Sequence, residues 1–378
     1  MKAETACVHG AKDKNNTTGA AAVPIYQAAT FSHLGVNSST GYDYSRLQNP
    51  TREALENLVS MLEGAADTLA FSTGMAAVSA VMELFSPGSH IIATDDLYGG
   101  SIRLFENISK KNGINVQYIN TCNIGEIKDA INENTRAVFI ETPTNPMMRV
   151  TDISSVAEIL RDKDILLIAD NTFLTPYFQK PLNLGADIVL HSGTKYLGGH
   201  NDTLAGFLAV KSPDIAEKLR FIFKTTGACL APFDSFLIIR GIKTLALRME
   251  KAQANAAVIA NWLLTRDNVS AVYYTGLKTH PEYEISIKQA SGFGAMISFE
   301  VDTAETARRV LERVKLIMFA ESLGGVETLI TYPTLQTHAD VPAKEKEGRG
   351  INDSLLRLSV GIENAEDLIE DLRQALEC

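Results

Sequence analysis

The chain has 378 residues, of which 45% are hydrophobic and 21% charged, and its formal net charge is −10. A chain of this length is longer than a domain with a single hydrophobic core usually is, so we expect two domains. The acidic balance argues against a nucleic-acid partner. No apolar run reaches the roughly 20 residues that span a bilayer, and the N-terminus lacks the apolar segment of a secretory signal. The sequence therefore predicts a cytoplasmic protein with no membrane partner.

The four cysteines, Cys7, Cys122, Cys229 and Cys378, are far apart and form no Cys-x-x-Cys pair. This spacing argues against both a zinc site and a disulfide framework, and we expect no bound metal. Free thiols in a reducing compartment are the simpler interpretation.

Three regions are expected along the chain. Residues 1–45 show little periodicity and many small or polar side chains, which predicts an extended arm that packs on another subunit. Residues 46–235 alternate short apolar runs with helical segments, which indicates βαβ units and a mostly parallel sheet between helices. Residues 236–378 begin with a long helical stretch, bent or interrupted near Gly241, and continue as a smaller α+β domain. The predicted strands of the large domain are residues 67–71, 90–95, 136–141, 165–170, 186–192 and 206–210.

Residues with functional potential follow several of these strands, at the edge where open α/β sheets bind ligands. In AFSTGMAA, a hydroxyl and Gly74 stand at a helix start, which favours an anion such as phosphate or simply a tight turn. Tyr98 precedes two glycines and is either structural or a stacking residue. Asp170 ends an apolar strand, where it either pairs with a ligand or caps the next helix.

Ser192, Thr194 and Lys195 stand at the end of the next strand, in VLHSGTKYLGG. A lysine beside hydroxyls and glycines indicates phosphate binding, carbonyl chemistry or an exposed turn. Pyridoxal phosphate is the one ligand that uses all of these parts. It needs an anion site, an aromatic side chain, an acid for its ring nitrogen and a lysine for a Schiff base. The P-loop, GxGxxG, HExxH and GxSxG motifs are absent, which disfavours the competing enzyme classes.

Nine motifs resemble those of the Cys/Met-metabolism family of pyridoxal-phosphate enzymes, the cystathionine γ-synthase and γ-lyase group. They are GYDYSRLQNPTREALE, FSTGMAAVSAV, DDLYGGSIRLF, ETPTNP, IADNTFLTP, HSGTKYLGGHND, RGIKTLALRM, AESLGGVETLI and LLRLSVGIENAEDLIEDL. They run in the family's order from about Tyr26 to the C-terminus. The resemblance implies fold type I of the pyridoxal-phosphate-dependent transferases, which is aspartate aminotransferase-like. It also implies pyridoxal 5′-phosphate as cofactor and a homodimer with shared active sites, assembled into a homotetramer.

The resemblance also implies roles for the matching cofactor positions. Lys195 would form the Schiff base and shuttle protons, and Asp170 would pair with the ring nitrogen. Tyr98 would stack on the ring and act as acid or base. The other cofactor-binding positions would be Gly74, Met75, Ser192 and Thr194 at the phosphate, Asn145 at a cofactor oxygen, and Tyr44 and Arg46 at the phosphate of a neighbouring subunit. Without the resemblance, Tyr44 and Arg46 could simply connect the arm to the core.

For the substrate, the resemblance implies that Arg357 binds the α-carboxylate with Ser322 and Asn145 beside it. From the pattern alone, Arg357 would be a surface charge on a strand edge. Glu321, Asp43 and Arg103 match polar positions of the γ-synthases and γ-lyases. An acidic residue there suits the distal ammonium group of cysteine or cystathionine.

Several enzymes of the family remain open. The motifs GGHNDTLAG, LAPFDSFLIIRG and TYPTLQTHADVP resemble cystathionine γ-synthases of Gram-positive bacteria. We therefore expect γ-replacement, in which an O-acylhomoserine loses its acyl group and cysteine adds to give cystathionine. Cystathionine γ-lyase is the main alternative, because it needs nearly the same pocket. Cystathionine β-lyase, O-acetylhomoserine sulfhydrylase and methionine γ-lyase follow, and a non-catalytic protein that binds pyridoxal phosphate is the alternative from another class.

Overall fold

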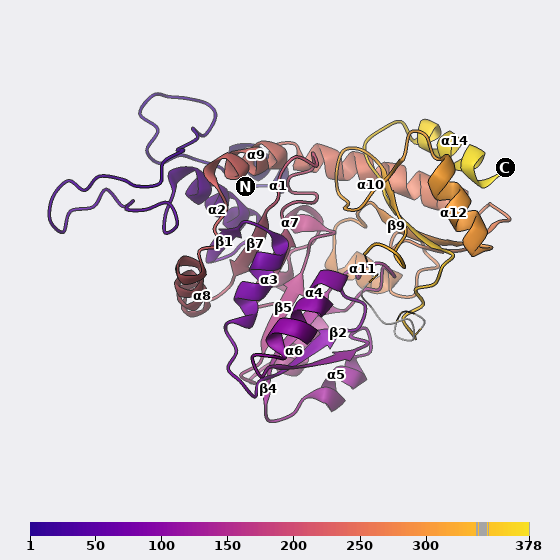
Figure 1. Ribbon diagram of the computed structural model, residues 1–378, viewed down its shortest axis with the longest axis horizontal. Coiled ribbons are helices and arrows are strands. Elements are labelled where there is room, and N and C mark those ends of the chain that lie inside the picture. The colour runs from indigo at the N-terminus through magenta and orange to yellow at the C-terminus, as the bar shows by residue number, and fades with distance from the viewer. Residues whose placement is uncertain (338, 340–345, 347, 378) are drawn as a thin grey trace.

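The computed structural model describes residues 1–337, 339, 346 and 348–377. Cys378 and part of the motif at residues 331–342 lie outside these described residues. Figure 1 shows two sheets of different size, each packed with helices. No helix within the described ranges has the length and apolar character needed to cross a bilayer.

The larger sheet has seven strands in the order β1-β7-β6-β5-β4-β2-β3. They are β1 (Asp67–Phe71), β2 (His90–Thr94), β3 (Asn115–Ile119), β4 (Thr135–Glu141), β5 (Leu166–Asp170), β6 (Ile188–Ser192) and β7 (Gly206–Val210). Strand β7 is antiparallel to both of its neighbours, whereas the pairs from β3 to β6 are parallel. The predicted, mostly parallel sheet is confirmed. The sequence prediction omits β3, because this edge strand is partly exposed along its whole length.

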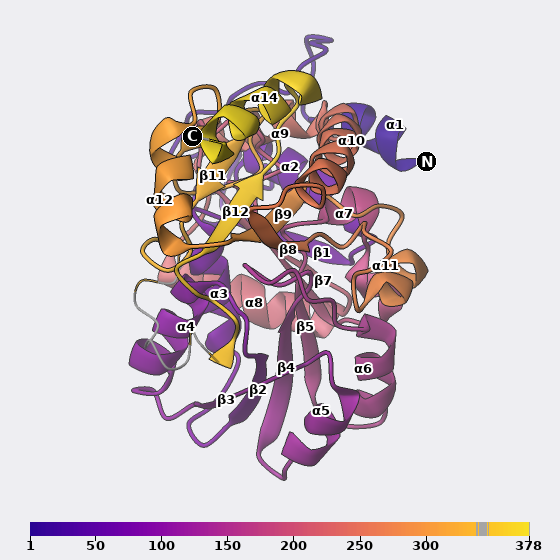
Figure 2. The same ribbon diagram turned by 90° about the vertical axis from the view of Figure 1, so that its right-hand side faces the viewer.

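Helices cover both faces of the larger sheet. They are α2 (Pro50–Glu63), α3 (Gly74–Met82), α4 (Gly99–Leu104) with the π-helical turn η1 (Phe105–Ser109), α5 (Ile124–Ala130), α6 (Ile153–Leu160), α7 (Thr175–Phe178), the 3-10 turn η2 (Pro181–Leu184) and α8 (Pro213–Thr226). Helices α3, α4 and α8 lie on one face, and α5 and α6 on the other (Figure 2). Ile91 and Phe139 pack into one buried layer, and Ile92 and Val138 into the opposite one. Successive strand residues point to opposite faces, so continuous apolar runs suit a sheet between two helical layers.

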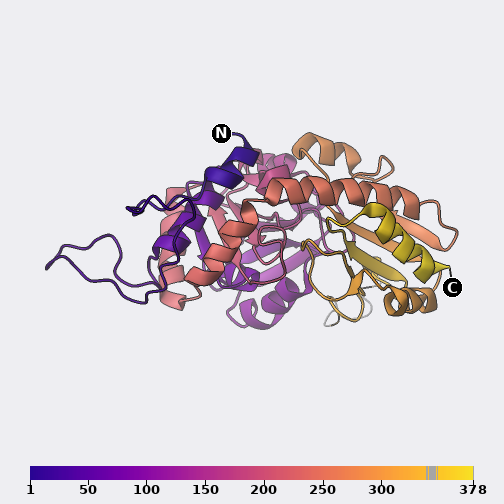
Figure 3. The same ribbon diagram turned by 90° about the horizontal axis from the view of Figure 1, so that it is seen from above.

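The second sheet has five strands in the order β10-β11-β12-β9-β8. Its strands are β8 (Val269–Tyr273), β9 (Met296–Val301), β10 (Met318–Phe319), β11 (Leu329–Thr331) and β12 (Leu355–Ser359). Its helices are α9 (Pro232–Ile242), α10 (Leu245–Leu263), α11 (Tyr283–Gln289), α12 (Ala304–Arg313) and α14 (Ala365–Leu376). The break between α9 and α10 lies close to Gly241, as predicted. Helix α10 extends from α9 to the C-terminal helix α14 (Figure 3). The proposed domain limits at residues 45 and 235 stay a prediction.

The N-terminal segment differs from the predicted extended arm at its start. Residues Ala3–His9 form the short helix α1, which packs against α2 and α10 with Ala6 and Cys7 buried. Small apolar side chains on one face allow this close packing. Between α1 and α2 the chain is irregular, and much of it projects from the body of the molecule (Figures 1 and 3). The arm description therefore fits only this later stretch.

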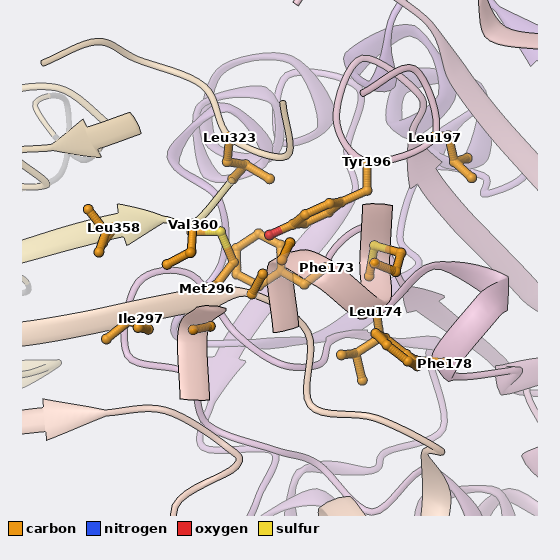
Figure 4. Close-up of a cluster of buried hydrophobic side chains, with 14 of the residues drawn as sticks. Phe173, Leu174, Phe178, Tyr196, Leu197, Met296, Ile297, Leu323, Leu358 and Val360 are labelled. Atoms are coloured by element: carbon orange, nitrogen blue, oxygen red, sulfur yellow. The ribbon is translucent and has the colours of Figure 1, made fainter. Parts of the chain in front are cut away.

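A buried apolar cluster joins the two sheets. From the loops of the larger sheet it contains Phe173, Leu174, Phe178, Tyr196 and Leu197, and from the second sheet and its loops Met296, Ile297, Leu323, Leu358 and Val360 (Figure 4). Full burial of one such side chain contributes about 1.5–3 kcal/mol relative to exposure. Tyr196 directly follows Lys195, so this packing also fixes the main chain beside that lysine.

Candidate active site

A cavity of about 470 Å³ lies at the carboxyl ends of β1, β4, β5 and β6, and it is also lined by β12 and by loops of the second sheet. Most of the predicted site residues line it: Gly74, Met75, Tyr98, Arg103, Asn145, Asp170, Ser192, Thr194, Lys195, Glu321, Ser322 and Arg357. In the sequence, these residues are spread from the segment after β1 to strand β12. The structure therefore brings residues of both sheets into one site.

Lys195 is mostly buried, and its side chain contacts the loop between β10 and β11 of the second sheet. Its Nζ donates a hydrogen bond of 2.6 Å to Ser322 Oγ. Burial, and then the positive charge of Arg357, lower the pKa of Lys195 to about 8, although Glu321 acts in the opposite direction. A lysine with a pKa lowered by burial and a neighbouring cation is a much better nucleophile at neutral pH.

Asp170 ends β5 and lines the same cavity. Its Oδ1 accepts hydrogen bonds from the main-chain N of Thr172 at 3.0 Å and from Thr172 Oγ1 at 2.6 Å. Burial raises the pKa of Asp170, while the hydrogen bonds from Thr172 lower it. The carboxylate therefore caps a local turn at Thr172 and not helix α7, whose N-cap residue Leu174 receives no side-chain capping hydrogen bond, so the helix-capping alternative is wrong. The pairing of Asp170 with a ligand stays a prediction. The prediction missed Thr172, whose position two residues after an Asp is typical of such turns.

The start of helix α3 forms an anion-binding arrangement. Thr73 caps the helix, and its Oγ1 accepts a hydrogen bond of 3.0 Å from Ala76 N. The N–H groups of Gly74 and Met75 belong to the first turn, where no intrahelical acceptor is available. A Cβ atom at Gly74 would lie 3.1 Å from the Cβ of Ser192, so the helix start and Ser192 are in close contact. Main-chain N–H groups at a helix start beside a hydroxyl are groups that bind phosphate in proteins, and their role here stays a prediction.

Gly206→Ala is expected to disturb the start of helix α3, because Gly206 packs directly against the main chain of Thr73. A Cβ atom at Gly206 would lie only 2.1 Å from the carbonyl oxygen of Thr73. We expect overpacking to lower the free energy of unfolding by about 1–3 kcal/mol, measured by urea unfolding. The control is Gly35→Ala in the arm, where the nearest atom would be 3.9 Å away. Equal urea midpoints for the two variants would contradict the predicted close packing.

Tyr98 is the N-cap residue of α4 and is 41% exposed. Its main-chain N donates a hydrogen bond of 3.0 Å to Glu141 Oε2. A Cβ atom at Gly100 would lie 2.4 Å from Tyr98 Cε1, so the ring lies directly against this glycine. The sequence prediction missed Glu141, although it noted the ETPTNP motif that this residue begins.

Arg357 is 1% exposed on β12, between β11 and β9, so the alternative of a surface charge on a strand edge is wrong. Nη1 donates to Asn145 Oδ1 at 2.7 Å, and Nη2 to the carbonyl oxygen of Ser322 at 2.9 Å and to Thr331 Oγ1 at 3.1 Å. Nε is buried without a hydrogen-bond partner in the described part of the chain. Burial lowers the pKa of Arg357 to about 10. A buried guanidinium with an unsatisfied N–H beside a cavity is suited to bind a carboxylate.

Asn145 is positioned by a buried carboxylate. Thr144 Oγ1 donates to Asp96, and Met147 N donates to Asp96 Oδ2 at 3.1 Å. Burial raises the pKa of Asp96 to about 6. Asp96 thus holds both flanks of the loop that presents Asn145 to Arg357.

Three predicted residues do not line the cavity of their own chain. Arg46 Nη1 donates to the carbonyl oxygen of Lys224 at 2.7 Å, and its guanidinium lies 5.4 Å from the centre of the Tyr44 ring. Asp43 accepts a hydrogen bond of 2.6 Å from Ser39 Oγ. The role of Tyr44 and Arg46 at the site of a neighbouring subunit and that of Asp43 in substrate binding stay predictions, which a structure of a substrate-bound oligomer would test.

Two further expectations from the sequence concern a bound metal ion and the cysteines. Where the structure describes the chain, no group of three or more His, Cys, Asp or Glu residues could hold a metal ion. Cys7, Cys122 and Cys229 are free cysteines, and Cys7 is buried.

Comparisons with known proteins identify the family of the chain. The family model described as Cys/Met metabolism PLP-dependent enzyme matches residues 4–377. The chain is 48% identical to a cystathionine gamma-lyase of Bacillus subtilis (strain 168) over 377 residues, which is 100% of both chains. It is 48% identical to a cystathionine beta-lyase of Lactococcus lactis subsp. cremoris (strain MG1363), over 99% of this chain and 98% of that protein.

A third relative and a solved structure extend the comparison. The chain is 47% identical to a cystathionine gamma-synthase/O-acetylhomoserine (thiol)-lyase of Bacillus subtilis (strain 168), over 96% of this chain and 93% of that protein. The crystal structure of a cystathionine gamma-lyase from Lactobacillus plantarum, complexed with L-serine, superposes with a TM-score of 0.97 at 43% identity. That match covers 99% of this chain and 98% of the other. The chain therefore belongs to the family of PLP-dependent enzymes of Cys/Met metabolism.

Proposed function

We propose that this enzyme catalyses γ-replacement on an O-acylhomoserine by cysteine, which yields cystathionine. The observation that carries the proposal is the pair of opposite charges in one cavity. Arg357 offers a cation to an α-carboxylate, and Glu321 offers a carboxylate to a distal ammonium group. Both are close enough to Lys195 to change its pKa. The cavity therefore suits a substrate or product with amino-acid groups at both ends, such as cystathionine.

The cavity residues fit pyridoxal phosphate. The first turn of α3, with Ser192 and Thr194, would hold the phosphate, and Asp170 would hold a proton at the ring nitrogen. Tyr98 would cover one face of the ring. When bound, pyridoxal phosphate supplies an aldehyde that condenses with amines and a ring that withdraws electrons from the substrate α-carbon.

The residues of the chain would then orient the substrate and move its protons. Arg357 would bind the α-carboxylate, with Asn145 on Nη1 fixing the guanidinium plane. Lys195 Nζ would take the α-proton and later a β-proton, and it starts from a hydrogen bond with Ser322 Oγ. Its lowered pKa suits this work, because a base is most useful when its pKa lies near the working pH.

Cystathionine γ-lyase is the second candidate, and its support is equally specific. The relative from Bacillus subtilis with this name is 48% identical over the full length of both chains. A γ-lyase would use the same charges to bind cystathionine as its substrate. No single residue of the cavity separates the two reactions.

A product assay on the cofactor-loaded enzyme separates them. O-acetylhomoserine, O-succinylhomoserine and cystathionine are each supplied with and without cysteine. We expect cystathionine to form from one ester and cysteine faster than 2-oxobutyrate forms from cystathionine. Rapid release of cysteine and 2-oxobutyrate, with little transfer from either ester, would instead identify a γ-lyase. Pyruvate and homocysteine from cystathionine would identify a β-lyase.

The lowered pKa of Lys195 predicts how cofactor uptake depends on pH. Only the neutral amine attacks an aldehyde, and the neutral form dominates above the pKa, which is about 8 here. The rate at which the apoenzyme binds pyridoxal phosphate covalently should therefore rise as the pH increases through about 8 and then level off. Stopped-flow absorbance between pH 6 and 10 measures this rate. A rise continuing to the usual lysine pKa of about 10.4 would contradict the predicted environment.

A further inference from the structure

Glu141 is a second buried carboxyl group in the cavity, beside Asp170. It ends β4, is 6% exposed and lines the cavity. In the pairing of β4 with β5, Glu141 and Asp170 are direct partners. Partner residues on neighbouring parallel strands point to the same face, and the strands are about 4.8 Å apart. The two carboxyl groups therefore stand side by side.

Glu141 also holds the main chain that carries Tyr98. Its Oε2 accepts a hydrogen bond of 3.0 Å from Tyr98 N. Tyr98 is the N-cap residue of α4, and its own side chain makes no capping hydrogen bond. The position of the Tyr98 ring over the cavity thus depends on an acceptor that comes from another strand.

The charges around Glu141 disfavour its ionised form. Burial, and then Asp170, raise its pKa well above the usual range, and Asp96 acts in the same direction. Arg357 and the hydrogen bond from Tyr98 N act in the opposite direction. Two buried carboxyl groups side by side cannot both ionise without a large energetic cost, as in other carboxylate pairs.

We propose that Glu141 is a positioning residue of the cofactor site, where its carboxyl group stays protonated beside an ionised Asp170 and anchors Tyr98 through the main chain. The inference rests on the proposed location of the cofactor ring between Tyr98 and Asp170. The proton on Glu141 leaves this pair of carboxyl groups with one negative charge, on Asp170, the residue proposed to pair with the ring nitrogen. The carbonyl oxygen of the protonated acid remains available to accept from Tyr98 N.

The proposal predicts opposite results for two replacements of nearly equal size. Glutamine is neutral and keeps an oxygen that accepts from Tyr98 N, so Glu141→Gln should resemble the native protein. Methionine has a similar length but no such acceptor, so Glu141→Met should release the Tyr98 main chain. Loss of one buried hydrogen bond and of the aromatic position should weaken cofactor binding about tenfold.

The test is a titration of each apoenzyme with pyridoxal phosphate, followed by visible absorbance. We expect the dissociation constant to rise about tenfold for Glu141→Met and by less than about threefold for Glu141→Gln. Equal weakening in both variants would overturn the proposal, because it would show that the charge of Glu141 is required. Native affinity in both would overturn it as well, because nothing would depend on the anchor.

A control variant separates an effect on the position of Tyr98 from a general loss of protein stability. Glu56 on α2 is also 6% exposed, accepts a hydrogen bond of 2.9 Å from Ala70 N and lies outside the cavity. Glu56→Met should lower the free energy of unfolding without changing the dissociation constant of the cofactor.

A second experiment tests the proposal if Glu141→Met fails to fold. It is a pH titration of the visible absorbance band in Glu141→Gln. A protonated Glu141 predicts a midpoint unchanged from that of the native holoenzyme, and a shift beyond about half a pH unit overturns the proposal. These readouts involve no substrate, so they are independent of the proposed γ-replacement.

Discussion

Replacement of Lys195 by alanine is expected to abolish the visible absorbance of the bound cofactor and to lower kcat by about a thousandfold or more. The physical reason is that, among the residues that the structure describes, Lys195 is the only lysine that lines the cavity. The variant loses both the group that binds the aldehyde covalently and the base that moves the substrate protons. Visible spectra of the purified protein and initial rates with an O-acylhomoserine and cysteine measure the two effects.

Lys128→Ala on α5 is the matched control, because Lys128 is exposed and does not line the cavity. We expect this control to keep the native spectrum and rate. Turnover and a native visible band in Lys195→Ala would show that another lysine serves the site. That outcome would contradict the assignment of Lys195.

Arg357→Lys is expected to lower kcat/KM by about 100-fold, mainly through KM. Lysine keeps the positive charge but not the planar donors that contact Asn145, Ser322 and Thr331. An ammonium group cannot bind a carboxylate in two parallel hydrogen bonds. Steady-state rates over a range of amino-acid substrate concentrations separate the effect on KM from that on kcat.

Arg308→Lys on α12 is the control for this substitution, because Arg308 is exposed and does not line the cavity. It should leave both constants unchanged. A native KM in Arg357→Lys would mean that the substrate carboxylate binds elsewhere. A fall in kcat alone would contradict a role in substrate binding.

The strand-end residues were predictable because a parallel sheet collects the carboxyl ends of its strands at one edge. Asp170 and Lys195 each follow a short apolar run, so the pattern of strands was enough to place them together. Arg357 is different. Its strand belongs to the second sheet, and only the resemblance to the family connected it with Lys195.

The positions that the sequence did not reveal depend on contacts between distant segments. Glu141 ends a predicted strand, but its importance comes from the pairing with Asp170 and from the main chain of Tyr98. Thr331 matters because β11 lies beside β12, an antiparallel pairing that the pattern of the chain does not specify. Helix α1 was missed because its seven residues carry only a short apolar face. Such features follow from tertiary packing, which local patterns do not encode.

Borohydride reduction of the holoenzyme is the most direct test of the covalent attachment of the cofactor to Lys195. Reduction converts the bond between a lysine and the cofactor into a stable one, and mass spectrometry of a digest then identifies the modified peptide. We expect the cofactor on Lys195, in the segment HSGTKYLGGHND that begins with the last two residues of β6. A cofactor attached to any other lysine, or no attachment in a protein with a native visible band, would contradict it.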